Sequence, residues 1–200
     1  MIARAKKHVG IYGGSFDPIH LGHLIVAQDC LEQAGLESVI FVPTAQSPLK
    51  SHAPRTEDKH RLEMVKRSIA HQSAFNCSDH EIERGGVSYT IETIQHFKNK
   101  QPETEFHLII GQDQIEQLLA WHAIETLVKT VNFIAVCRPG YTAEPPKIPG
   151  IRFQTIETHA MDISSSEIRE RFQNGLSNEL FLHPEVSRYI TKQGIYGHSA

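Results

Sequence analysis

Residues 9–23 read VGIYGGSFDPIHLGH, and this stretch decides the fold. Its first four residues form a mostly apolar segment, typical of a short buried strand, which ends at Gly13 and Gly14. From Leu21 to Leu31 apolar residues recur at helical spacing, and Gly35 is placed to end that helix. A strand, two glycines and a helix start predict the first βα unit of a parallel sheet.

The same alternation continues along the chain. Short apolar strands joined by helices predict an α/β fold with a doubly wound parallel sheet covered on both faces. We expect a single domain over residues 1–200, in which residues 163–194 form a small helical C-terminal part. Further strands are expected near 39–42, 75–82, 106–110, 131–137 and 151–156, and helices near 56–71, 89–98, 114–129, 164–174 and from 184 onward.

The amino-acid composition argues against several classes of function for this chain. The chain has 200 residues and a net charge of −3, from 20 Lys and Arg against 23 Asp and Glu, which argues against a broad surface for DNA or RNA. Three separated cysteines without a CxxC pair indicate a reducing compartment. No run of about 20 apolar residues is present, so we expect a cytoplasmic protein without a membrane partner. Whether it forms a homo-oligomer stays open.

The residues after the first strand indicate a phosphate site. Glycines at a strand end let the backbone approach a ligand, and the following helix start offers free N–H groups and a positive dipole end. His20 and His23 are three residues apart and share one helix face. Gly22 between them leaves room for a flat base or ribose. Two imidazoles there can bind phosphate oxygens during phosphoryl transfer.

Other interpretations of these residues are weaker. A tight turn with two surface histidines does not explain why the glycines and the histidine pair coincide at one strand end. Zinc would need a third ligand at a convincing spacing, which is missing. A dehydrogenase would need GxGxxG and an acidic residue after the second strand, but that strand ends in Val42-Pro43-Thr44.

GGSFDPIHLGH closely resembles the signature of the HxGH nucleotidyltransferase superfamily. Residues 163–169, ISSSEIR, resemble its second element, ISSTxIR, with Ser166 where threonine is usual. The resemblance implies a Rossmann-like fold, with His20, His23 and Arg169 as catalytic residues. The ATP-binding residues that it implies are Gly13, Gly14, Ser15, Phe16, His20, His23, Ile163, Ser164, Ser165 and Arg169.

Further segments resemble the bacterial nicotinic acid mononucleotide adenylyltransferases within that superfamily. Trp121 is the only tryptophan and corresponds to a ring that stacks on the pyridine; packing in the core is its alternative interpretation. The loop ending Ser47-Pro48-Leu49-Lys50 departs from the family's PxxxPPHK, and His122 stands where tyrosine is common. The mononucleotide-binding residues that the resemblance implies are Lys50, Ser88, Tyr89, Thr90, Gly111, Asp113 and Trp121.

The resemblance implies adenylyl transfer from ATP to nicotinic acid mononucleotide, which gives nicotinic acid adenine dinucleotide and pyrophosphate in NAD biosynthesis. Mg²⁺ is expected with ATP, without a cluster of protein ligands. One alternative is another enzyme of the superfamily, such as a phosphopantetheine adenylyltransferase, although those usually carry TxGH. A nucleotide-binding sensor without activity is a second alternative. A tRNA-linked enzyme is disfavoured by the negative charge.

Overall fold

The computed structural model describes residues 6–48, 54–137, 140, 144, 146–159 and 161–197, and the strands in these residues form one parallel sheet. The strand order is β3-β2-β1-β4-β5-β6, and every neighbouring pair is parallel. This confirms the predicted doubly wound α/β fold. The strands are β1 (His8–Gly14), β2 (Ser38–Pro43), β3 (Phe75–Cys77), β4 (Glu105–Gly111), β5 (Asn132–Cys137) and β6 (Phe153–Glu157).

The strand order reverses between β1 and β4, which lie side by side with Ile11 opposite Leu108. From β1 the chain proceeds outward to β2 and β3, and it then returns to β4 on the other side of β1. The connections that leave β1 and β4 therefore diverge, and they open a crevice at the carboxyl edge of the sheet. Gly14 ends β1 and Gly111 ends β4, so both glycines lie at this crevice.

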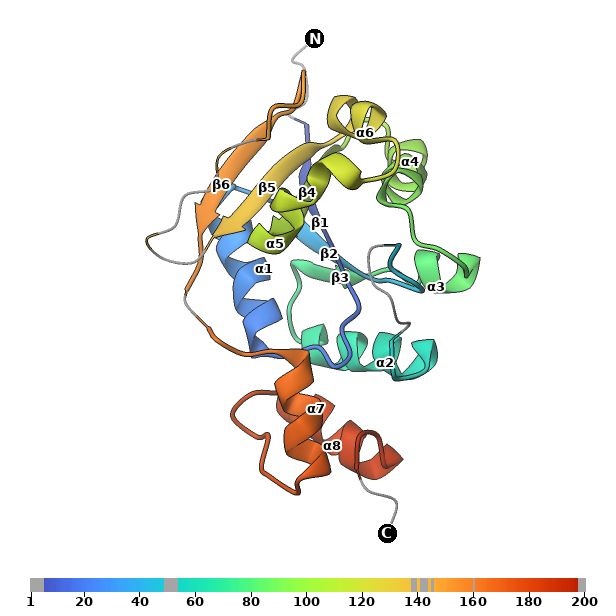
Figure 1. Cartoon of the computed structure of the whole chain (residues 1–200), viewed down its shortest axis with the longest axis vertical. Coiled ribbons are helices and arrows are strands. Elements are labelled where there is room, and N and C mark those ends of the chain that lie inside the picture. The colour runs from blue at the N-terminus through green and yellow to red at the C-terminus, as the bar shows by residue number, and fades with distance from the viewer. Residues whose placement is uncertain are drawn as a thin grey trace.

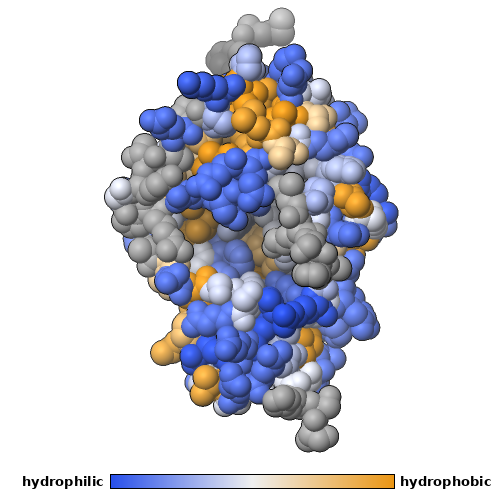
Figure 2. Space-filling view, in the orientation of Figure 1, coloured by the Kyte–Doolittle hydropathy of each residue, from blue (hydrophilic) through white to orange (hydrophobic). Residues whose placement is uncertain are grey.

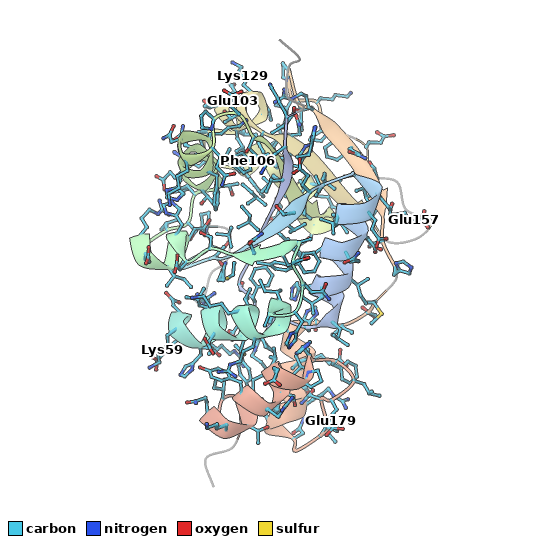
Figure 3. The ribbon with its side chains drawn as sticks, turned by 180° about the vertical axis from the view of Figure 1, so that it is seen from behind. Lys59, Glu103, Phe106, Lys129, Glu157 and Glu179 are labelled. Carbon is cyan, nitrogen blue, oxygen red and sulfur yellow. The ribbon has the colours of Figure 1, made fainter. Side chains whose placement is uncertain are left out.

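Helices cover both faces of the sheet (Figure 1). α4 and α6 pack on one face over a cluster that includes Phe106, while α1 and α2 pack on the other face. Figure 3 shows Phe106 inside the molecule, with charged side chains such as Lys59 and Glu157 at its periphery. The helices in the described residues are α1 (Leu21–Gln33), α2 (Asp58–Ile69), α3 (His80–Arg84), α4 (Thr90–Lys100), α5 (Gln112–Glu116), α6 (Ile124–Thr130), α7 (Ser165–Gln173) and α8 (Pro184–Gln193), with a 3₁₀ turn η1 (Leu118–Ala120).

The C-terminal helices α7 and α8 extend the molecule beyond α2 (Figure 1). Ser164 caps α7 by accepting a hydrogen bond from the Glu167 N–H, and Pro184 is the first residue of α8, as predicted for both helices. The α8 side chain of Tyr189 contacts α2 through its hydroxyl, 2.8 Å from His60 Nδ1. Because Ile168 and neighbouring apolar residues join the core cluster under α1 and α2, this part shares a core with the sheet.

The predicted strand over residues 75–82 is wrong beyond Cys77, because the chain turns there into the short helix α3. The turn buries Glu81, whose carboxylate accepts a 2.5 Å hydrogen bond from the Thr93 hydroxyl of α4. Gly85 then ends α3 in the left-handed region, at φ 67°. Ile82, the last residue of the predicted strand, belongs to this helix.

The predicted helix over residues 114–129 is also wrong as a continuous element. It is divided into α5, η1 and α6. Ala123 has φ 52°, in the left-handed region, and Trp121 has an extended backbone, so helical hydrogen bonds cannot run through them. The break lies beside Trp121, which lines a pocket.

None of the helices in the described part of the chain combines the length and apolar character needed to cross a membrane. The cysteines Cys30, Cys77 and Cys137 are free thiols. Burial raises the pKa of both Cys30 and Cys77 to about 12, so these thiols stay protonated and unreactive near neutral pH.

Candidate active site

Two adjoining pockets open at the crevice between β1 and β4. The larger has a volume of about 1400 Å³ and the smaller of about 320 Å³. Figure 2 shows the hollow of the larger pocket between α5 and the start of α7. The two pockets share one wall, formed by Gly13, Gly14, Ser15 and Gln114. A ligand in one pocket therefore lies beside a ligand in the other.

The two glycines that end β1 have different roles. A Cβ on Gly14 would lie 3.0 Å from the ring of Phe16, which is buried and folds back with φ 46°. A Cβ on Gly13 would meet nothing within 4 Å, and Gly13 lines both pockets. Gly14 is thus needed for packing, whereas Gly13 leaves open space for ligand.

His20 and His23 stack at the start of α1, with ring centroids 3.7 Å apart. The His20 backbone N–H donates to His23 Nδ1 at 3.2 Å, so a neutral His23 carries its proton on Nε2. Burial lowers the pKa of His20 to about 4, which keeps that ring neutral at pH 7. Its Nδ1 is buried without a hydrogen-bond partner. Both rings line the larger pocket and are placed to donate to an anion there.

Gly22 lines the larger pocket and also makes room for the histidine pair. A Cβ at this position would lie 3.1 Å from His20 Nδ1 and 3.2 Å from its Cε1. The imidazole of His20 therefore occupies the space that a side chain at position 22 would take. Gly22 is the residue that lets the two rings stack.

The start of α7 is fastened to the turn that precedes α1. Ser165 Oγ donates to the Pro18 carbonyl at 2.8 Å, and Arg169 Nη1 donates to the Asp17 carbonyl at 2.7 Å. A second nitrogen of Arg169 donates to Ser166 Oγ at 2.9 Å, while its Nε is buried without a partner. Segments 147 to 152 residues apart in the sequence thus form one wall of the larger pocket.

Asp17 is a buried carboxylate beneath this wall. Burial alone would raise its pKa, but hydrogen bonds from Thr56, Tyr196 and the Arg55 backbone, together with the charge of Arg169, lower it overall. The Arg55 N–H donates to Asp17 Oδ2 at 2.8 Å, and the Tyr196 hydroxyl donates to Oδ1. The ionised carboxylate therefore joins the C-terminal part to the loop before α2.

The smaller pocket is built around the start of α4. Ser88 is buried there, and its Oγ accepts a 3.1 Å hydrogen bond from the Ala45 N–H, which holds the loop after β2. The rings of Tyr89 and His122 lie 4.5 Å apart, and Trp121 lies on the same wall. An aromatic slot beside a pocket lined by two histidines is suited to a flat ring that carries a phosphate.

Comparison with known proteins agrees with this arrangement. Residues 11–171 match the family model "Cytidylyltransferase-like". A protein of Opitutus terrae named "Probable nicotinate-nucleotide adenylyltransferase" is 39% identical over 189 residues, which are 94% of this chain and 97% of that protein. A protein of the same name from Herpetosiphon aurantiacus is 41% identical over 196 residues, covering 95% and 98%. This chain belongs to the nicotinate-nucleotide adenylyltransferase family.

A solved structure of the same family supports the fold. The Plasmodium falciparum nicotinic acid mononucleotide adenylyltransferase, complexed with NaAD, matches with a TM-score of 0.77 and 26% identity. The match covers 95% of this chain and 97% of that one. The Rossmann-like fold expected from the motifs is therefore the fold of the family.

The structure gathers the predicted residues of the adenylyltransferase site into the two pockets. All ten residues expected to bind ATP line the larger pocket. Ser88, Tyr89, Thr90 and Trp121 line the smaller pocket, as expected for the mononucleotide group. Gly111 and Asp113 were grouped with them but line the larger pocket, at the start of α5. Lys50 lies outside the described residues.

Sequence reasoning missed Arg61, a fully buried arginine that holds the pocket edges in this adenylyltransferase. Its two terminal nitrogens donate to the Ser15 and Thr44 carbonyls, both at 2.6 Å, and one of them also pairs with Asp58 at 2.6 Å. Arg61 thus ties the loop after β1 to the loop after β2. A signal was present, because Arg61 precedes Met64, Val65 and Ser68 on the buried face of α2.

The smaller pocket of the adenylyltransferase also contains buried polar atoms that the sequence did not reveal. Glu81 lines it, with Oε1 bonded to Thr93 and Oε2 buried without a partner. Trp121 Nε1 is likewise buried without a partner. Among the described residues there is no group of three or more His, Cys, Asp or Glu side chains that could hold a metal ion.

Proposed function

We propose that this chain transfers the AMP group of MgATP to nicotinic acid mononucleotide and releases pyrophosphate. The observation that carries the proposal is the shared wall at Gly13 and Ser15, with the stacked histidines on one side and the aromatic slot on the other. The family relation supports the same reaction. Nicotinic acid adenine dinucleotide, the product, belongs to NAD biosynthesis.

In this proposal the larger pocket binds ATP. The helix starts at His20 and Ser164 direct N–H groups and positive dipole ends toward it, which favours the triphosphate. The neutral imidazoles of His20 and His23 donate to phosphate oxygens. Arg169 adds positive charge while it holds the turn at Asp17.

The smaller pocket binds the mononucleotide, with the pyridine ring against Trp121 and Tyr89. Trp121 and the shared wall line the same pocket, so a mononucleotide with its ring stacked on Trp121 can extend its phosphate to that wall. Thr90 at the start of α4 offers a hydroxyl and a helix N-terminus to the nicotinate carboxylate. Glu81 lies on the same wall and accepts hydrogen bonds, so it is suited to hydroxyl donors and not to anions.

The reaction is a direct in-line displacement. A phosphate oxygen of the mononucleotide attacks the α-phosphorus of ATP, a new P–O bond forms, and the bond to the bridging oxygen of pyrophosphate breaks. Phosphate is already ionised, so the residues need to position the reactants and to stabilise charge rather than remove a proton. Mg²⁺ enters with the triphosphate as part of the substrate. We place the reaction in the cytoplasm, in keeping with three free cysteines.

Pyrophosphate release from MgATP tests the proposal, with nicotinic acid mononucleotide and nicotinamide mononucleotide supplied separately. We expect rapid release with the acid and slow release with the amide. Equal release with both would retain the reaction and remove the acid preference. Release with phosphopantetheine alone would identify the other superfamily enzyme, and ATP binding without release from any acceptor would identify a sensor.

A further inference from the structure

Asp29 and His159 form a carboxylate–imidazole pair at the rim of the larger pocket. The Asp29 side chain, in α1, is 6% exposed, whereas that of His159, after β6, is 79% exposed. Asp29 Oδ1 lies 2.9 Å from His159 Nδ1, and Asp29 Oδ2 accepts the His159 backbone N–H at 3.0 Å. One buried carboxylate therefore holds both the backbone and the ring of His159 in place. Neither residue takes part in the proposed reaction.

The position of His159 places it at the nucleoside end of the larger pocket. The histidine pair and the α7 start occupy the polar end, which suits phosphates. The lining also includes the apolar side chains of Val26, Val136, Cys137 and Met161. Cys137 lies next to this histidine along the sheet edge, because its carbonyl accepts the N–H of Thr158. A nucleoside triphosphate that lays its phosphates at the helix starts can direct its base to these apolar side chains, next to His159.

The hydrogen bond to Asp29 fixes which nitrogen of the His159 ring can accept a hydrogen bond from a ligand. A carboxylate only accepts hydrogen bonds, so Nδ1 of His159 must carry the proton. In the neutral imidazole the other nitrogen, Nε2, is then an acceptor. Adenine presents a donor, the 6-amino group, at the edge where hypoxanthine and guanine present a 6-oxo acceptor. In this tautomer Nε2 can accept a hydrogen bond from the amino group, whereas its lone pair repels the oxo group.

We propose that His159 reads the base of the nucleotide, accepting a hydrogen bond from the 6-amino group of adenine, and that Asp29 positions it by fixing its tautomer. The proposal rests on the proposed function, because it takes the larger pocket as the ATP site. It adds a specificity residue for ATP over 6-oxo purine nucleotides.

The test compares kcat/KM for ATP and for inosine triphosphate at pH 8, by pyrophosphate release with nicotinic acid mononucleotide. His159→Ala and His159→Phe should each lower the ATP preference by about tenfold, which is the contribution of one hydrogen bond. Phenylalanine keeps a flat ring, so it separates stacking from recognition of the amino group. His71→Ala is the matched control, because His71 is exposed and lines neither pocket. An unchanged ATP preference in both His159 variants would overturn the proposal.

Asp29→Asn tests the positioning role. An asparagine amide can donate to Nδ1, which moves the ring proton to Nε2 and makes it a donor. We expect the ATP preference to fall below that of His159→Ala while the KM for the mononucleotide stays unchanged. A variant that loses only thermal stability and keeps the ATP preference would show that Asp29 is merely structural.

The inference and the proposed function fail in different ways. If the unaltered protein releases no pyrophosphate, the proposed reaction is wrong, and calorimetric binding of ATP and inosine triphosphate by the His159 variants then tests the base contact alone. If the unaltered protein is active and the His159 variants keep its ATP preference, only the base contact is wrong.

Discussion

The two pockets share a wall but differ in how their other walls are built. The larger pocket is enclosed by segments bonded to one another through backbone carbonyls, as where Arg169 and Ser165 hold the turn at Asp17 and Pro18. The smaller pocket is lined by side chains at element ends, such as Tyr89 before α4 and Trp121 after η1.

We expect this difference to separate residues that support the chemical step from residues that select the substrate. A wall held together by side-chain hydrogen bonds to backbone carbonyls keeps one geometry, which suits steps in which phosphates must be held in place. A slot made of side chains changes its shape with single substitutions. We therefore expect substitutions in the larger pocket to lower kcat and substitutions in the smaller pocket to raise one KM.

The largest effect is expected for His23→Ala. Loss of one donor to the developing charge should lower kcat by about 10²–10³-fold, or roughly 3–4 kcal/mol of barrier. Steady-state pyrophosphate release measures the loss, and circular dichroism checks that the fold is retained. The exposed His71→Ala variant serves as control. Near-normal turnover in a folded His23→Ala protein would remove this residue from catalysis.

Trp121→Ala tests the smaller pocket. Base–aromatic stacking is typically worth about 1–3 kcal/mol, so the KM for the mononucleotide should rise roughly tenfold or more. The KM for ATP should stay unchanged. Leu119→Ala, in the neighbouring turn and exposed, is the matched control. A loss of stability with an unchanged KM would instead assign Trp121 to core packing.

Gly22→Ala should separate activity from stability. Alanine favours a helix over glycine by about 1 kcal/mol, which offsets the close contact of its Cβ with the His20 ring. We expect a melting temperature close to that of the unaltered protein. Because the His20 ring must shift by a few tenths of an ångström against His23, kcat should fall about threefold to fivefold. Unchanged kcat would mean that the stacked arrangement is not used.

The smallest effect concerns pH. The pKa of His20 falls to about 4 in the folded protein because the ring is buried, whereas in the unfolded chain it is near 6.5. Stability from the neutral ring is therefore complete above about pH 6.5 and is lost as the pH falls toward 4. Between pH 6.5 and 4 the melting temperature of the His20→Gln variant should therefore fall by a few degrees less than that of the unaltered protein. Parallel profiles for the two proteins would contradict the assignment.

The fold was predictable where local pattern and tertiary packing agree. The strands β1, β2, β4 and β5 are apolar runs that end at glycine, proline or a polar loop, and they pack as their pattern requires. The lining of the larger pocket was predictable because most of its expected residues lie in two contiguous motifs that resemble those of the superfamily, from Gly13 to His23 and from Ile163 to Arg169.

The remaining features depend on contacts between distant segments. The break at Ala123 has no local marker, because alanine normally favours a helix. Arg61 looks like an ordinary charged residue until the Ser15 and Thr44 carbonyls are placed beside it. Asp29 and His159 are 130 residues apart, and nothing in either neighbourhood indicates the other.

The open space at Gly13 has a consequence for molecules that are long enough to fill both pockets. Once one end of such a molecule is bound, its other end is held near the second pocket at an effective concentration in the millimolar range. The dinucleotide product is a bivalent ligand of this kind, so it should bind more tightly than either substrate. Departure of the product would then limit turnover, and a stable mimic of its length would be a natural starting point for an inhibitor.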